Sequence, residues 1–227
     1  MLEAADIGAR YGRIPALNGV TLTVAPGEAI GIVGHNGMGK TTLLKTLMGY
    51  LPLASGSIRF DGRDIGREPT HRRARLGLAY VPQGREIFPF LTVAENLRMG
   101  GAANLDEIIA DFPALAPLLG RQGGSLSGGE QQILAIARCM VMRPKCILLD
   151  EPTEGIQPSI VEAIADLLAR LRAQRRLALV IVEQRLEFVA GLAERVLVMQ
   201  KGSVVKEMPA AGLADRAAIE DLIGMGA

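Results

Sequence analysis

The sequence predicts an α/β fold in which helices cover both faces of a mostly parallel β-sheet. The first observation is a set of short, almost wholly apolar runs, typical of strands buried on both faces: residues 29–33, 146–149, 179–182 and 196–199. The second is that helical patterns separate these runs, which is the order that produces parallel strands. The third is composition: 49% of the 227 residues are hydrophobic and only 4% are aromatic, which suits an aliphatic core.

The N-terminal part predicts a half-buried strand followed by a buried one. Over residues 20–24 three apolar side chains alternate with two threonines, which is the period-2 pattern of a strand with one buried face. Pro26-Gly27 is a turn signal, and residues 29–33 form the buried strand. This strand leads into a Gly-rich loop.

The middle of the chain predicts a helical lobe inserted into the α/β core. Before it come a helix over 40–48 with Gly49 as its C-cap, a strand over 57–60 with a hairpin turn at Asp61-Gly62, and a strand over 78–81. From about 84 to 137 the pattern turns helical, with breaks at Pro and Gly. This change of pattern marks the lobe.

After the buried strand over 146–149, Pro158 opens a long amphipathic helix. Its apolar face consists of Ile160, Ile164, Leu167, Leu168 and Leu171. A weak helix is expected over 214–223. We find no internal repeat and no low-complexity linker.

Charge and cysteine content exclude several classes of function. The formal net charge is +1, and no basic stripe is interleaved with aromatic residues, so we expect no nucleic-acid partner. The short basic run Arg72, Arg73 and Arg75 is expected to be a solvated patch. Cys139 and Cys146 are expected to be small buried residues, because two cysteines without clustered histidines make neither a metal site nor a disulfide framework.

The sequence predicts a protein that reaches a membrane only through partners. It has no run of ~18 apolar residues that could span a bilayer. Residues 1–6 are acidic and lack the basic-then-apolar order of a signal peptide. We therefore expect the chain to stay in the cytoplasm.

The strongest motif matches G-x-x-x-x-G-K-[ST] and lies between a buried strand and a helix start. Its glycines let successive backbone N–H groups point inward and form a positive nest for phosphate oxygens. Lys40 is expected to reach the β- and γ-phosphates and Thr41 to ligate Mg²⁺. The phosphate-loop residues are Gly34, His35, Asn36, Gly37, Met38, Gly39, Lys40, Thr41 and Thr42. His35 is expected to face solvent and to contribute its backbone.

Asp150 and Glu151 directly follow the buried run 146–149. Open α/β sheets bind their ligands at this carboxyl end of the strands. Asp150 can hold Mg²⁺ through its water shell. Glu151 is then placed to orient and polarise an attacking water. An Asp-Glu pair after a strand indicates a nucleotide site only because the phosphate loop precedes it in the chain.

A third motif, LSGGE, predicts a helix whose N-terminus is capped by Ser127 and Glu130 in a capping box. Its residues are Leu126, Ser127, Gly128, Gly129 and Glu130. Such a helix start can present backbone N–H groups to an anion. On spacing alone, an ordinary capped helix is the better interpretation.

Together these motifs resemble the ATP-binding cassette family over nearly the whole chain. The resemblance implies a P-loop NTPase with a RecA-like core, an antiparallel β subdomain and a helical subdomain inserted at about 84–140, all within one domain over 1–227. It implies ATP held between the phosphate loop of one subunit and the LSGG helix of a second. It also implies that Tyr11 stacks on adenine, with plain packing as the alternative, and that Gln83 senses Mg²⁺ beside Thr41 and Asp150.

Two departures from the family pattern stand out. Gln157 replaces the usual Asp in the loop after Glu151, which puts that loop's contacts between subunits in doubt. Gln184 occupies the place of a His that touches the γ-phosphate. We predict that Gln184 makes this contact by hydrogen bonding alone, since an amide carries no charge. Glu183 is not expected to face a phosphate. The predicted catalytic residues are thus Glu151, Gln184 and Lys40.

Glu183-Gln184 and the segments 80–89 and 151–158 resemble the branch that imports branched-chain amino acids, urea and short-chain amides. The resemblance implies membrane permease subunits, a second cassette ATPase that is identical or different, and indirectly a solute-binding protein. It places the chain peripherally at the cytoplasmic face of the cell membrane. A permease helix is expected to dock near Gln83 and about residues 85–96, with core packing as the alternative for half of the apolar residues there.

Other functions fit the sequence less well. A soluble cassette ATPase acting on DNA would carry a long coiled coil between its two halves, and one acting on ribosomes usually holds two cassettes. A kinase with the same phosphate loop would not need LSGG. A non-enzymatic scaffold would lack Glu151 or Lys40, and both are present.

Overall fold

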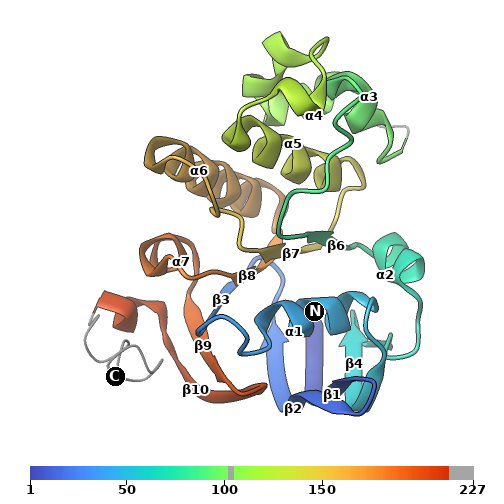
Figure 1. The fold of residues 1–227 in the computed structure, drawn as a ribbon, viewed down its shortest axis with the longest axis vertical. Coiled ribbons are helices and arrows are strands. Elements are labelled where there is room, and N and C mark those ends of the chain that lie inside the picture. The colour runs from blue at the N-terminus through green and yellow to red at the C-terminus, as the bar shows by residue number, and fades with distance from the viewer. Residues whose placement is uncertain (102–104, 215–227) are drawn as a thin grey trace.

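The computed structural model describes residues 1–101 and 105–214, which build two β-sheets and their covering helices (Figure 1). The larger sheet has the strand order β10-β9-β3-β8-β7-β6, and only β10 runs antiparallel to its neighbour. Its strands are β3 (Ala29–Val33), β6 (Leu78–Val81), β7 (Cys146–Asp150), β8 (Ala178–Val182), β9 (Arg195–Gln200) and β10 (Ser203–Pro209). The predicted mostly parallel sheet is confirmed.

The smaller sheet is antiparallel, with the order β2-β1-β4-β5. Its strands are β1 (Leu2–Tyr11), β2 (Ile14–Val24), β4 (Leu53–Phe60) and β5 (Arg63–Asp64). The strand β1 was not predicted from the sequence. This strand changes register near Asp6, which has a positive φ of 52°, so its side chains do not keep a simple alternation.

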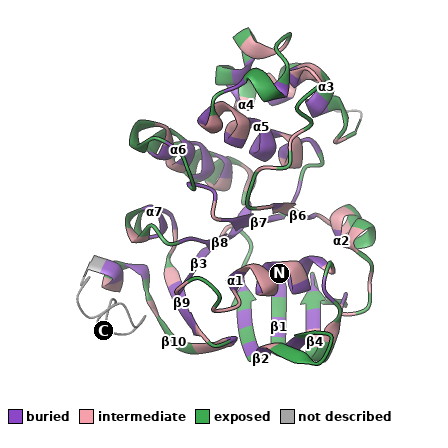
Figure 2. Cartoon of the chain, in the orientation of Figure 1, coloured by how far each residue is buried: buried purple, intermediate pink, exposed green. Residues whose placement is uncertain are grey.

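The two faces of the large sheet are buried in two different cores. In β7, Ile147 and Leu149 pack against the helices α5 (Gly128–Val141) and α6 (Pro158–Arg175). Leu148, between them, packs with α1 (Lys40–Met48) and the antiparallel sheet. Figure 2 shows the result: the central strands are buried throughout, whereas the antiparallel strands alternate between buried and exposed residues. This two-sided burial explains the continuous apolar runs in the sequence.

A helical lobe lies between β6 and β7. Its elements are α3 (Val93–Arg98), α4 (Leu105–Asp111), the short 3₁₀ helices η1 (Pro113–Leu118) and η2 (Gly123–Ser125), and α5. The remaining helices are α2 (Thr70–Leu76), α7 (Leu186–Leu192) and η3 (Ala210–Ala214). The helix expected over 214–223 lies, beyond its first residue, outside the described part of the chain. Among the residues described, no helix has both the length and the apolar character needed to cross a membrane.

Both cysteines were expected to be buried. Cys146 is buried at the start of β7, whereas Cys139 in α5 is partly buried, and its thiol donates a hydrogen bond to the Tyr80 carbonyl at 3.4 Å. Burial raises the pKa of Cys139 to about 11 and that of Cys146 to about 12, so both thiols stay protonated at neutral pH.

The expectation that Arg73 belongs to a solvated patch is wrong. Arg73 is only 2% exposed. Its guanidinium donates to the carbonyls of Thr46 at 2.9 Å and Leu47 at 2.6 Å, in the last turn of α1, and to that of Glu68 at 2.8 Å. A cation at a helix C-terminus satisfies carbonyls that have no partner within the helix. Arg73 therefore anchors the far end of the helix that starts at the phosphate loop, whereas the neighbouring Arg72 is exposed.

We expect Arg73→Ala to lower the free energy of unfolding by about 3 kcal/mol, because several buried carbonyls lose a charged donor. Urea denaturation followed by circular dichroism measures this loss. Arg72→Ala is the matched control and should cost less than about 1 kcal/mol, since its ion pair with Glu68 is exposed. Equal effects of the two substitutions would show that the Arg73 contacts do not stabilise α1.

Candidate functional site

A cleft of about 680 Å³ opens where the central parallel strands end. Its lining brings together residues from separate parts of the sequence: Tyr11, Asn36, Lys40, Gln83, Glu151 and Gln184. The loops after β3, β7 and β8 meet here because neighbouring parallel strands end at the same edge of the sheet.

The phosphate loop connects β3 to α1 and wraps around the Lys40 ammonium. Lys40 is 4% exposed, and its Nζ donates to the carbonyls of Gly34 at 2.6 Å and His35 at 2.9 Å. Burial lowers the pKa of Lys40, while the negative charges of Glu151, Asp150 and Glu183 oppose this shift. A Cβ on Gly34 would lie 2.4 Å from the Met199 carbonyl oxygen, so only glycine fits at the start of the loop.

Asp150 lies at the end of β7 with two hydroxyl groups around its carboxylate. It is 1% exposed, and it accepts hydrogen bonds from Thr41 Oγ1 at 3.0 Å and from the Tyr80 hydroxyl at 2.9 Å. Burial raises the pKa of Asp150 even though both hydrogen bonds oppose the shift. The Asp150 carboxylate and the Thr41 hydroxyl are the hard oxygen ligands that Mg²⁺ uses together with phosphate oxygens and water. The donor set therefore fits this metal.

Tyr80 was not predicted as a site residue. It lies in β6 among apolar residues, and a phenol in a buried strand needs a hydrogen-bond partner. That requirement is the one signal in the sequence that could have identified it. Its partner Asp150 is 70 residues away along the chain.

Glu151 is held between two side-chain amides in a strained backbone conformation. Its φ is 47°, in the left-handed region that non-glycine residues rarely occupy. Gln184 Nε2 donates to Glu151 Oε1 at 3.0 Å, and Gln83 Nε2 approaches Oε2 at 3.4 Å. The same Gln184 nitrogen donates to Asn36 Oδ1 at 2.9 Å. One glutamine thus connects Glu151 to the phosphate loop.

Of the residues predicted to bind the metal, Thr41 and Asp150 lie in contact. Gln83 lines the same cleft as Thr41, and its amide nitrogen donates to the carboxylate of Glu154 at 3.0 Å and to that of Glu151 at 3.4 Å. Glu154, from the loop after β7, also lines the cleft and was not predicted as a site residue.

Tyr11 and His35 lie at the edge of the same region. Tyr11 is 50% exposed on the cleft, so it is not a buried packing residue. His35 is half-buried, and its carbonyl accepts from Lys40. Lys201 and Gly202, which follow β9, also line the cleft.

The LSGG segment forms the capping box predicted for it. Ser127 Oγ accepts from the Glu130 backbone N–H at 3.3 Å, and the Ser127 N–H donates to Glu130 Oε2 at 2.7 Å. Gly129 is packed against α6, because a Cβ there would lie 2.4 Å from Ile160. Among the residues that the structure describes, residues 126–130 do not line the cleft.

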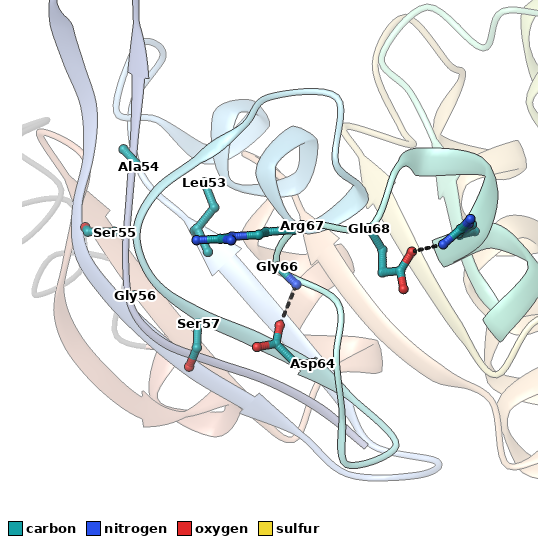
Figure 3. Close-up of a pocket in the computed structure, with 10 residues that line it drawn as sticks. Leu53, Ala54, Ser55, Gly56, Ser57, Asp64, Gly66, Arg67 and Glu68 are labelled. Atoms are coloured by element: carbon teal, nitrogen blue, oxygen red, sulfur yellow. Dashed lines mark hydrogen bonds and ion pairs between the residues drawn. The ribbon is translucent and has the colours of Figure 1, made fainter.

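A separate hollow of about 700 Å³ lies on the antiparallel sheet (Figure 3). Its acidic side chains already have partners: Asp64 accepts from the Gly66 N–H at 2.8 Å, and Glu68 pairs with Arg63 and Arg72. Lys40, Glu151 and Gln184, the residues predicted to be catalytic, line the cleft at the strand ends instead.

Comparison with known proteins identifies relatives of the whole chain. Residues 17–154 match the family model described as "ABC transporter". The chain is 38% identical to the high-affinity branched-chain amino acid transport ATP-binding protein BraG of Pseudomonas aeruginosa, over 97% of this chain and 98% of BraG. It is 30% identical to BraF, a branched-chain amino acid transport ATP-binding protein of the same organism, over 89% of each chain.

Solved structures with the same fold include two ATP-binding cassettes of ABC transporters. One, in an ADP conformation, has a TM-score of 0.86 and 27% identity, covering 100% of this chain and 99% of that one. The other, a dimeric bacterial ABC transporter cassette, has a TM-score of 0.83 and 25% identity, covering 92% and 99%.

We expect Asp150→Asn to make the nucleotide-free protein more stable at pH 7, because it removes a desolvated charge. The raised pKa of Asp150 means that the folded state binds a proton more readily than the unfolded state. The stability of the wild type therefore falls as the pH rises from the ordinary Asp pKa through the raised value. The advantage of Asp150→Asn should shrink as the pH is lowered through that window.

Urea denaturation of the two proteins across this pH range measures the difference. Asp166→Asn, an exposed change on α6, is the control and should leave the pH dependence unaltered. A loss of stability in Asp150→Asn at pH 7 would contradict the electrostatic argument.

Proposed function

This chain belongs to the ABC transporter family, whose ATPases couple ATP hydrolysis to transport, and we propose that it powers the uptake of branched-chain amino acids or related small amides. The observation that carries the proposal is the convergence of Lys40, Glu151 and Gln184 on one cleft. A phosphate loop, a carboxylate that can orient water and an amide that can contact the γ-phosphate are the parts that ATP hydrolysis requires.

ATP binds with its phosphates in the loop between β3 and α1. The backbone N–H groups of the loop and the N-terminus of α1 provide the anion site, and Lys40 exchanges carbonyl partners for the β- and γ-phosphates. Tyr11 stacks on the adenine at the exposed edge of the cleft, which its half-exposed ring permits. Thr41 and Asp150 hold Mg²⁺, which neutralises negative charge on the phosphates when bound.

Glu151 orients the attacking water. Its carboxylate accepts a hydrogen bond from the water and takes the proton as the water oxygen bonds to the γ-phosphorus, while the bond from that phosphorus to the β–γ bridging oxygen breaks and ADP leaves. Gln184 donates to Glu151 and to the phosphate loop, so it is placed to hold Glu151 toward the γ-phosphate. Gln83 contacts the other carboxylate oxygen. Because the helical lobe follows Gln83 in the chain, a displacement of Glu151 is transmitted to the lobe through this residue.

A second cassette completes the nucleotide site. The Ser127 helix start lies outside the cleft of its own chain, so the N–H groups of its first turn can face the γ-phosphate bound by another subunit. ATP then shifts the equilibrium toward the closed pair, and hydrolysis removes the contact. Because BraG and BraF are two transport ATP-binding proteins of one organism, we expect a different cassette as the partner of this chain.

The membrane subunit docks in a groove of about 290 Å³ between the core and the helical lobe. Exposed Tyr50, Met99 and Met142 line it together with the charged Arg85, Glu86 and Arg138, and such a mixed lining suits an amphipathic helix. The segment 85–96 contributes less than the sequence suggested. Phe88 and Phe90 are exposed, whereas Ile87 packs against the core.

The proposed transporter contains permease subunits and takes its solute from a solute-binding protein, with this chain at the cytoplasmic face of the membrane. Branched-chain amino acids are favoured by the similarity to BraG and BraF. Urea and short-chain amides as solutes are supported only by the sequence of residues 155–159. A cassette ATPase acting on nucleic acid or ribosomes is disfavoured, because the relatives compared are transport proteins over nearly their whole length.

We expect Glu151→Gln to lower ATP turnover by about 10²-fold or more, because an amide cannot take the proton from water. The variant still binds ATP and should therefore accumulate as an ATP-dependent dimer. Light scattering after size exclusion, with ATP and separately with ADP, measures this. A dimer that forms only when a second cassette is added identifies a mixed pair, and a monomer in saturating ATP even with that cassette contradicts the scheme.

We expect Gln184→Ala to lower turnover about tenfold and to weaken ATP-dependent dimerisation, because it removes a hydrogen bond to a charged group. Gln184→His restores a donor at this position and should retain more activity than the alanine variant. Steady-state hydrolysis and dimerisation of the three proteins test this, and an alanine variant that equals the wild type in both removes Gln184 from the mechanism.

A further inference from the structure

Glu183 is a buried carboxylate directly after β8 that the mechanism above does not use. It is 3% exposed, and it lies between the loop carrying Glu151 and the loop carrying Gln184. The sequence predicted only that it would not face a phosphate. Its carboxylate accepts four hydrogen bonds instead.

The four donors come from two loops. Glu183 Oε1 accepts from the Thr153 backbone N–H at 2.9 Å and the Thr153 hydroxyl at 2.5 Å. Glu183 Oε2 accepts from the backbone N–H groups of Gln184 at 2.7 Å and Arg185 at 3.1 Å. One carboxylate thus joins the loop after β7 to the loop after β8.

Only an ionised carboxylate can make this connection. It offers two oxygens with about four acceptor sites and no hydrogen, whereas a glutamine amide offers one oxygen and an NH₂ group. In Glu183→Gln that NH₂ would face either the N–H groups of Gln184 and Arg185 or the N–H of Thr153, and the remaining oxygen would carry no negative charge for the donors of the other loop. The substitution keeps the size of the side chain and weakens the connection to both loops.

The joined loops are the ones that hold the reacting groups. Thr153 is two residues from Glu151 and is 2% exposed. The backbone N–H of Glu154 donates to the Glu151 carbonyl at 3.1 Å, so the segment 151–154 forms a tight turn that ties Thr153 to Glu151. On the other side, the Gln184 amide already donates to the Glu151 carboxylate at 3.0 Å.

We propose that Glu183 is a positioning residue that fixes Glu151 relative to Gln184 and couples the γ-phosphate contact of Gln184 to the loop 151–157. This rests on the proposed function, because it takes Glu151 and Gln184 as the groups that act on ATP. When Gln184 moves with the γ-phosphate, its backbone carries Glu183 with it, and Glu183 carries Thr153. The second cassette then meets a loop whose position depends on the nucleotide.

Hydrogen exchange of the full-length protein tests the connection without requiring turnover. Glu183→Gln should raise exchange about tenfold or more at the amides of Thr153, Gln184 and Arg185, since each loses a charged acceptor. Glu162→Gln, the same change on the exposed face of α6, is the control and should leave both loops unchanged. Faster exchange in one loop only, or in neither, overturns the proposal.

Kinetics distinguish positioning from mere structural support. Glu183→Gln should lower kcat about tenfold or more while nucleotide affinity changes less than about threefold, because Lys40 and the phosphate loop are intact. Thr153→Val, which removes only the hydroxyl, should lower kcat less, and the double variant should be no worse than Glu183→Gln. Additive effects, or a raised KM with unchanged kcat, would refute the assignment.

Three further outcomes remain decisive. If Glu183→Gln does not fold, Thr153→Val carries the test, and it should speed exchange at Gln184 and Arg185 as well as at Thr153. If the wild type with a companion cassette hydrolyses no ATP, the proposed function fails while the exchange experiment still decides the role of Glu183. An active wild type with an unaffected Glu183→Gln refutes the role of Glu183 alone.

Discussion

The register of three parallel strands is the constraint on which the site depends. Val182 of β8 pairs with Ile32 of β3 on one side and with Asp150 of β7 on the other. The phosphate loop, the Glu151 loop and the Gln184 loop therefore leave the sheet at one level. Two hydrogen bonds reinforce this level: the Glu151 N–H donates to the Val182 carbonyl and the Glu183 N–H to that of Ile32. A slip of one residue would turn the reacting side chains to the opposite face of the sheet.

The charges of the site are compensated by neutral groups. Asp150 is held by hydroxyls, Glu151 by side-chain amides, Glu183 by backbone N–H groups and a hydroxyl, and Lys40 by carbonyls. In the part of the chain that the structure describes, no ion pair involves any of these four residues. Neutral partners hold a charge less tightly than a close counter-ion in a buried site does. A nucleotide and a metal ion can therefore displace these partners, which suits a site that opens and closes.

The helical lobe is tied to the same loops through one arginine. Arg85 donates to Gln131 in α5 at 3.2 Å and to the Glu154 carbonyl at 3.2 Å. It thus joins the helix that starts at the LSGG segment to the loop after Glu151. Together with Gln83, which contacts Glu151 and Glu154, it connects the edge of the groove between the core and the helical lobe to the cleft at the strand ends. The segment between β6 and the lobe therefore contacts both the groove and the cleft.

The buried strands, the phosphate loop and the capping box at Ser127 could be predicted from the sequence alone. Each of these depends on residues close together in the chain, so periodicity, glycine spacing and capping rules find them. The burial of Arg73, the hydrogen bond from Tyr80 to Asp150 and the two loops joined by Glu183 depend on the folded arrangement of distant segments. Arg73 is 27 residues from Thr46, Tyr80 is 70 from Asp150, and Glu183 is 30 from Thr153. A buried polar group forms hydrogen bonds with whichever partner the packing of distant segments places beside it. The pattern within one segment therefore does not predict that partner.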